Sequence, residues 1–209
     1  MEKKIYKITI DPTDQLTGLD AISLVEFPAV EFDFLKFSED GIKLSFENEE
    51  KQIISGVALL ADTPIYRLRP DGSEYYVVFT KEVIEQLVEK YSKYMFNNVV
   101  NIEHSDTHFV DGVFMIESYI KNAERGIVPI EFKEIPDGSW IVSYKVENRA
   151  VWDKIKSGEV KGFSVQGVFN LIDSKFSAQE LPETLDELVD RYKGEDKEIE
   201  EILNQINQK

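Results

Sequence analysis

Hydrophobic and polar residues alternate over several short stretches of the chain, and a period of two predicts β-strands. The clearest alternation covers residues 139–147, after a Pro136-Asp137-Gly138 turn, while residues 75–79 are aromatic and β-branched. The stretches that we expect to form strands are residues 4–10, 52–61, 65–69, 75–79, 99–103, 113–120, 139–147 and 160–172, the last as a strand pair or one bent strand. The pattern predicts a β-rich chain.

Two stretches have the helical period of 3.6 residues instead. Thr80 is placed to cap a helix that runs to about Met95, and Asn148 is placed to cap a shorter helix that ends at Gly158. After Ser177 a helical period recurs in a very acidic sequence, which predicts one or two exposed amphipathic helices. Because helices and strands do not alternate as βαβ units, we expect an α+β fold.

The same pattern divides the chain into three parts. Residues 1–48 are expected to be an N-terminal strand and arm, because residues 18–37 are apolar and interrupted by Pro28. Residues 49–175 are expected to be the main domain, and residues 176–209 an acidic helical tail.

Composition and charge exclude several classes of function. The chain has 209 residues, 42% of them hydrophobic, and a formal net charge of −16, which argues against binding to nucleic acid. It has no cysteine, which excludes disulfides and thiol catalysis and fits a reducing cytosol. No run approaches the roughly 20 apolar residues of a membrane span, and the N-terminus lacks the apolar core of a signal peptide. We therefore expect a cytoplasmic protein that binds neither nucleic acid nor membranes.

One serine and one histidine are candidates for nucleophilic catalysis. Ser164 lies between Gly162 and Gly167 on a predicted strand, and His104, one of two histidines, comes directly after the predicted strand 99–103. A histidine base can take the proton of a serine, and a third polar group usually fixes the tautomer of the histidine. We expect Ser164 and His104 to meet, although spacing alone favours a strand serine that faces solvent.

Glu117 is our candidate for the third group. It is a carboxylate within an apolar predicted strand, where a buried charge needs a partner, and His104 is a suitable one. An edge-strand glutamate that reaches water is an equal alternative, and Asp106 and Glu147 are other candidates.

A metal site is the competing interpretation of His104. His104 and His108, with Glu103 and Asp111 nearby, are possible ligands. Two histidines at this spacing chelate best on one helix face, whereas this segment leaves a strand. The sequence therefore favours a site without metal or cofactor.

Several motifs resemble a known family. They are residues 22–29, 101–104, 116–119, 138–148 and 152–164. Over residues 20–172 the chain resembles the XkdF-like serine proteases of tailed phages, which are similar to prohead maturation proteases and herpesvirus capsid proteases. The resemblance implies a β-barrel surrounded by a few helices, with Ser164 as nucleophile and His104 as general base. Herpesvirus-type enzymes use a second histidine; His108 precedes the serine in the chain rather than coming after it, so the third position stays open.

The resemblance also implies a role. The protein would be a serine endopeptidase that cleaves extensions of phage scaffold and major capsid proteins. It would act inside the assembling procapsid, in the host bacterial cytoplasm. The chain itself would be a further substrate, with residues 29–31 and 176–180 as candidate processing sites, and a homodimer is suggested by analogy. The alternative is a non-catalytic capsid-assembly or scaffold-fused module with the same fold.

Overall fold

The computed structural model describes residues 4–11, 13–14, 16–26, 35–36, 51–68, 71–105 and 109–173. All of them belong to the first of two units into which the chain divides, Met1–Asp173. The predicted acidic tail lies outside the described residues, as do both candidate processing sites. Ser164, His104 and Glu117 all lie within the described part of the chain.

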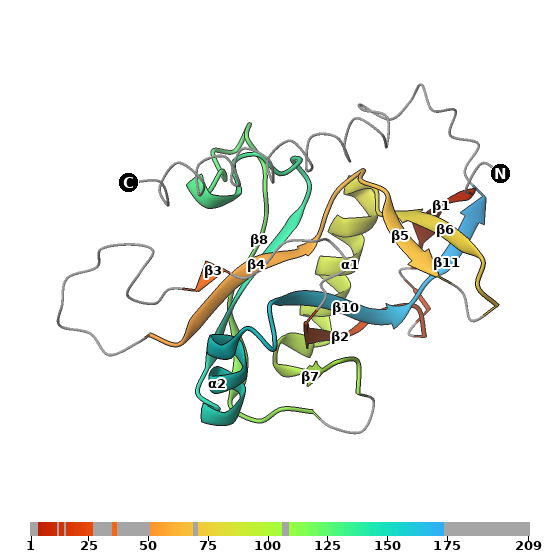
Figure 1. Cartoon of the computed structure of the whole chain (residues 1–209). Helices are drawn as coiled ribbons and strands as arrows, with labels where there is room; N and C mark the ends of the chain where they lie inside the picture. The colour runs from red at the N-terminus through yellow and green to blue at the C-terminus, as the bar shows by residue number, and fades with distance from the viewer. Residues whose placement is uncertain are drawn as a thin grey trace, which may run out of the picture. The chain divides into compact units, whose positions relative to one another are not determined.

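The strands form three sheets (Figure 1). The first contains, in order, β11 (Asn170–Asp173), β1 (Lys4–Thr9), β6 (Glu74–Val78) and β5 (Ile65–Leu68). The second contains β10 (Gly162–Val168), β2 (Gly18–Val25) and β7 (Val100–Ile102). The third contains β3 (Leu35–Lys36), β4 (Ile53–Leu59), β9 (Trp140–Val146) and β8 (Val113–Ile120). The pairs β1–β6 and β2–β7 are parallel, and the other pairs are antiparallel. The prediction of a β-rich chain is confirmed.

Residues 18–25 are not part of an arm but form β2, the central strand of the second sheet. This corrects the interpretation of residues 18–25 as part of a covering segment. Ile22 and Leu24 are fully buried, and β2 contacts strands on both sides. A strand buried on both faces is a nearly continuous apolar run, so it lacks the alternation that would have identified it.

The expected β-barrel is not confirmed. In the described part of the chain, none of the three sheets closes on itself. β10 and β4 belong to different sheets and lie close without strand pairing. Phe163 of β10 instead packs against Tyr144 of β9, with 5.4 Å between ring centroids. Side-chain packing therefore joins these sheets where a barrel would have a hydrogen-bonded seam.

Both predicted helices of the main domain are confirmed. Helix α1 (Lys81–Lys93) begins after Thr80, whose hydroxyl accepts a hydrogen bond from a backbone N–H of the first turn. Helix α2 (Arg149–Ser157) begins after Asn148 and ends at Gly158, which has a φ of 76°. Two short 3-10 helices, η1 (Phe96–Asn98) and η2 (Ile130–Phe132), complete the described helical segments.

A buried lysine ties α1 to the start of β2. The Lys90 ammonium donates hydrogen bonds to the backbone carbonyls of Asp11, Asp14 and Thr17, and the lysine is only 9% exposed. The carbonyls of Asp11 and Asp14 also accept backbone N–H groups, from Asp14 and Thr17, so the ammonium adds to the hydrogen bonds that order the β1–β2 connection. The central strand of the second sheet is thereby held against the helix.

No described helix is long and apolar enough to cross a membrane.

Candidate active site

A row of polar side chains crosses the second sheet. Ser164 of β10 lies opposite Ser23 of β2, and Ser23 lies opposite Asn101 of β7. All three are buried. Because residues directly opposite each other in a sheet project to the same face, strand register alone brings these side chains together.

His104 comes just after β7 and is turned toward this row by an uncommon backbone conformation. Glu103 and His104 both have positive φ, at 52° and 55°. Left-handed backbone is unfavourable for residues with a side chain, so neighbouring contacts must hold it. The backbone N–H of Glu103 donates to the carbonyl of Leu24, and its carboxylate accepts from the N–H of Glu26 at 2.6 Å. The turn that carries His104 is thus anchored to the end of β2.

The imidazole of His104 lies between two serine hydroxyls. Its Nε2 is 3.1 Å from Oγ of Ser164, and its Nδ1 is 2.9 Å from Oγ of Ser23. When Nδ1 carries the proton, it donates to Ser23, and Nε2 can accept the proton of Ser164. That tautomer is the one that a general base for Ser164 requires. The two residues predicted as nucleophile and base are brought within hydrogen-bond distance.

Sequence reasoning did not identify Ser23 as a residue of this site. It belongs to the motif at residues 22–29, but the surrounding segment was interpreted as an arm and Ser23 was given no role. The available signal was a polar residue within the apolar run 21–25. Such a residue in a buried strand needs a hydrogen-bond partner, and its partner is His104.

Glu117 is not brought to His104, contrary to the expected pairing. It is exposed on β8, directly opposite Ser143 of β9. Its carboxylate accepts a hydrogen bond from Oγ of Ser143 at 2.6 Å, and that hydroxyl is 2.6 Å from Oγ of Ser55. Register within the third sheet therefore decides the partner of Glu117.

Among the other candidates for the third position, Glu147 lies within the described residues and does not contact His104 there. Glu147 is exposed, and its backbone N–H donates to the carbonyl of Gly112. Asp106 and His108 lie outside the described residues. His108 is also one of the possible ligands of the alternative metal site. The described residues contain no group of three or more His, Cys, Asp or Glu side chains able to hold a metal ion.

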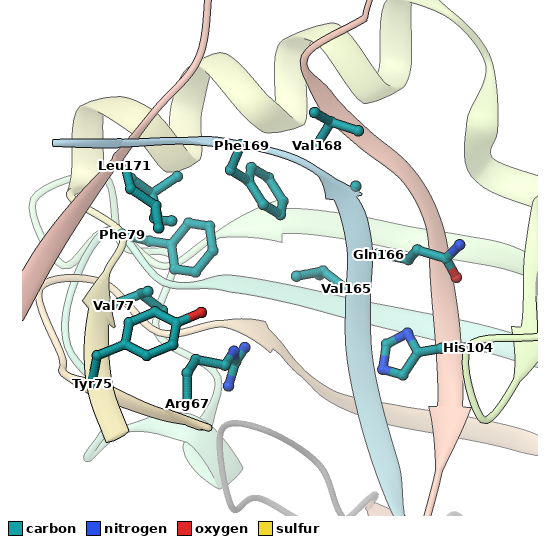
Figure 2. Close-up of a pocket in the computed structure, with 12 residues that line it drawn as sticks. Arg67, Tyr75, Val77, Phe79, His104, Val165, Gln166, Val168, Phe169 and Leu171 are labelled. Atoms are coloured by element: carbon teal, nitrogen blue, oxygen red, sulfur yellow. The ribbon is translucent and has the colours of Figure 1, made fainter. Parts of the chain in front are cut away.

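A groove of about 510 Å³ opens beside His104. Figure 2 shows the groove, with His104 and Gln166 on one side of β10 and Arg67, Tyr75 and Val77 on the other. Residues 165–169 also line the groove. Gln166 accepts a hydrogen bond from the Asn101 side chain at 2.8 Å, so the polar row continues into the groove. A groove next to a serine–histidine pair can hold a polypeptide substrate.

Comparison with protein families identifies the family of the chain. The family described as "Putative phage serine protease XkdF" matches residues 42–173. The chain belongs to this family. The part matched to the XkdF family includes Ser164 and His104, whereas Ser23 precedes it. Comparison with curated proteins and with solved structures gave no match.

Proposed function

We propose that this protein is a serine endopeptidase in which Ser164 is the nucleophile and His104 its general base. The observation that carries the proposal is the 3.1 Å separation of His104 Nε2 and Ser164 Oγ, at the side of a groove. Nucleophile and base within 2.6–3.2 Å, with the base held by another group, are the expected signature of covalent catalysis. Membership of a phage serine protease family supports the same reaction.

The reaction would proceed through an acyl-enzyme. Oγ of Ser164 attacks the carbonyl carbon of the scissile peptide bond while Nε2 of His104 takes the hydroxyl proton. The tetrahedral intermediate collapses, the C–N bond breaks, and His104 returns the proton to the leaving amine. Water, activated by the same nitrogen, then hydrolyses the ester and releases Ser164.

Ser23 would orient His104 through these steps. Its hydroxyl oxygen accepts a hydrogen bond from the Nδ1–H group of His104 and so keeps the ring oriented with Nε2 facing Ser164. A neutral hydroxyl stabilises an imidazolium less than a carboxylate would. We therefore propose a serine–histidine–serine arrangement in which the third member mainly positions the base.

We further propose that the substrates are phage proteins of the assembling procapsid. Family membership supports a phage origin. The proposed partners are scaffold and major capsid proteins, and the proposed compartment is the procapsid in the host bacterial cytoplasm. We also propose that the protein cleaves itself and that it forms a homodimer. The acidic composition, with a net charge of −16, favours protein substrates over nucleic acid.

The test is intact-mass analysis of the full chain co-expressed with the neighbouring capsid and scaffold proteins. We expect wild type to trim itself or these partners, and Ser164→Ala to trim neither. Ser157→Ala is the matched control, because Ser157 is an exposed serine at the end of α2. If wild type and Ser164→Ala give identical products, Ser164 is not the nucleophile. If nothing is trimmed by either, the non-catalytic assembly module takes the place of the protease.

A further inference from the structure

Among the described residues that line the groove beside His104, one side chain is permanently charged, that of Arg67. Much of the remaining lining is apolar and includes Ile8, Val77, Phe79, Val165, Phe169 and Leu171. Binding grooves of this kind use a small number of polar groups to select their ligand. Any selection of a ligand by its charge in this groove would therefore come from Arg67.

Strand pairing aims Arg67 into the groove. On β5 it lies directly opposite Tyr75 of β6, so both side chains project to the same face of the first sheet. Val77, two residues beyond Tyr75, lines the groove on that face as well. The ring of Tyr75 is held by an edge contact with Tyr6, with 5.7 Å between centroids. Figure 2 shows the Arg67 guanidinium beside Tyr75.

The Arg67 guanidinium has unused hydrogen-bonding capacity. Among the described residues it makes one hydrogen bond, from Nη1 to the backbone carbonyl of Tyr66 at 2.9 Å, and no ion pair with a carboxylate. A guanidinium has five N–H donors in a planar fork. Burial lowers the pKa of Arg67, and Tyr75 offsets part of that effect. A partly buried cation without a counter-ion is stabilised when an anion binds.

We propose that Arg67 is a specificity subsite that binds the carboxylate of a Glu or Asp side chain in the peptide substrate. This inference rests on the proposed protease function, because it places the carboxylate and the scissile bond in one groove. His104, residues 165–169 and Arg67 all line the groove, and Figure 2 shows β10 between His104 and Arg67. An extended peptide within it would present its scissile carbonyl at one end and an acidic side chain at the other. A planar guanidinium accommodates a carboxylate through two parallel hydrogen bonds, which an uncharged amide cannot reproduce.

Peptide binding to the full chain carrying Ser164→Ala tests the subsite without any cleavage. The probes are fluorescent Ala/Ser-rich peptides with a single Glu, scanned along the sequence, and matched peptides with Gln at the same position. At the best position we expect the Glu peptide to bind about 10-fold more tightly, and higher ionic strength to reduce that ratio. Equal affinity for the Glu and Gln peptides at every position would overturn the proposal.

Variants of Arg67 assign any preference to this side chain. We expect Arg67→Gln to abolish the Glu preference and Arg67→Lys to retain part of it, because the lysine keeps the charge without the planar fork. Arg125→Gln is the matched control, since it removes an exposed guanidinium from a turn outside the groove. A Glu preference that survives Arg67→Gln, with circular dichroism unchanged, would overturn the assignment.

Cleavage of a complex peptide mixture by wild type separates this inference from the proposed function. We expect cut sites with Glu or Asp at a constant distance from the scissile bond, and loss of that enrichment in Arg67→Gln. Cleavage without acidic enrichment would refute the subsite and leave the protease intact. No cleavage, together with Glu-selective binding that depends on Arg67, would refute the protease and leave the carboxylate site.

Discussion

Ser23 and His104 are hydrogen-bonded partners, with 2.9 Å between Oγ of the serine and Nδ1 of the imidazole. The bond lies on the side of the ring opposite Ser164, so both ring nitrogens face a serine hydroxyl. Ser23 and Ser164 are also opposite each other on β2 and β10. The two hydroxyls therefore hold the imidazole from adjacent strands of one sheet.

Replacing Ser23 tests whether it positions the base. We expect Ser23→Ala to lower kcat by roughly 10- to 100-fold with little change in KM, because the ring loses the acceptor that selects its tautomer. Nitrogen NMR of the labelled ring is the second measurement, and it should show that the Nδ1-protonated tautomer is depleted in the variant. A purely structural role would not change the tautomer.

Ser55→Ala is the matched control for this variant. Ser55 is buried and bonded to Ser143, outside the proposed catalytic row. We expect its kcat to stay within about twofold of wild type, since no group that touches His104 is removed. A loss equal to that of Ser23→Ala would assign the effect to packing rather than to His104.

Glu117 should be dispensable for the chemistry. Its carboxylate is bonded to Ser143 rather than to His104, so we expect Glu117→Gln to keep kcat within about twofold of wild type. The variant should lose about 1 kcal/mol or less of unfolding free energy, because the site is exposed and an amide still accepts the hydrogen bond. Urea unfolding and peptide cleavage are the two measurements. A fall in kcat of more than about 10-fold, at unchanged stability, would restore the carboxylate to the catalytic machinery.

Gly167 lies where β10 passes close to the backbone of β2. A Cβ at this position would lie 2.0 Å from the backbone oxygen of Gly18, and the strand register shifts between Gln166 and Gly167. Backbone cannot yield as a flexible side chain would, so we expect Gly167→Ala to cost about 3 kcal/mol or more in urea unfolding. It should also displace Ser164 from His104 and lower activity.

The control for this substitution separates steric overlap from backbone preference. Gly126 has a φ of 72° but nothing within 4 Å of the position that a Cβ would occupy. Gly126→Ala should therefore cost only about 1 kcal/mol, the penalty of left-handed backbone. Similar losses for the two variants would show that overlap with Gly18 is not the cause.

Stability should fall in alkaline solution because of a buried tyrosine in α1. Burial raises the pKa of Tyr91 to about 12 from 10.0, and its hydroxyl donates to the carbonyl of Phe96 at 2.5 Å. The folded state therefore binds this proton more tightly than the unfolded state. The resulting stability is fully present below pH 10 and is lost as the pH rises through 12, a change of about 2–3 kcal/mol.

Urea unfolding across this alkaline range measures the effect. Tyr91→Phe should reduce the decline in unfolding free energy without removing it, because burial also raises the pKa of Tyr144. Tyr76→Phe, a control on β6, should retain the wild-type decline. An unchanged decline in Tyr91→Phe would show that this hydroxyl does not determine the pH dependence.

The sequence by itself determined the elements whose signals are local. Thr80, Asn148 and Gly158 mark the ends of the two helices because capping depends on residues within one turn. Alternation identified strands in which polar and apolar residues take turns, such as β9, where Ser143 and Lys145 lie between Val142, Tyr144 and Val146. The family motifs singled out Ser164 and His104, whose side chains then proved to be 3.1 Å apart.

Only the tertiary structure decided which side chains became neighbours. Ser23 meets His104 because β2 lies between β10 and β7, and Glu117 meets Ser143 because β8 pairs with β9 in that register. Arg67 reaches the groove through its pairing with Tyr75. Strand order and register join segments far apart in the chain, and a period of two is the same whichever strand lies alongside. That is why the proposed base and nucleophile could be named from the sequence, whereas the hydrogen-bond partner Ser23 could not.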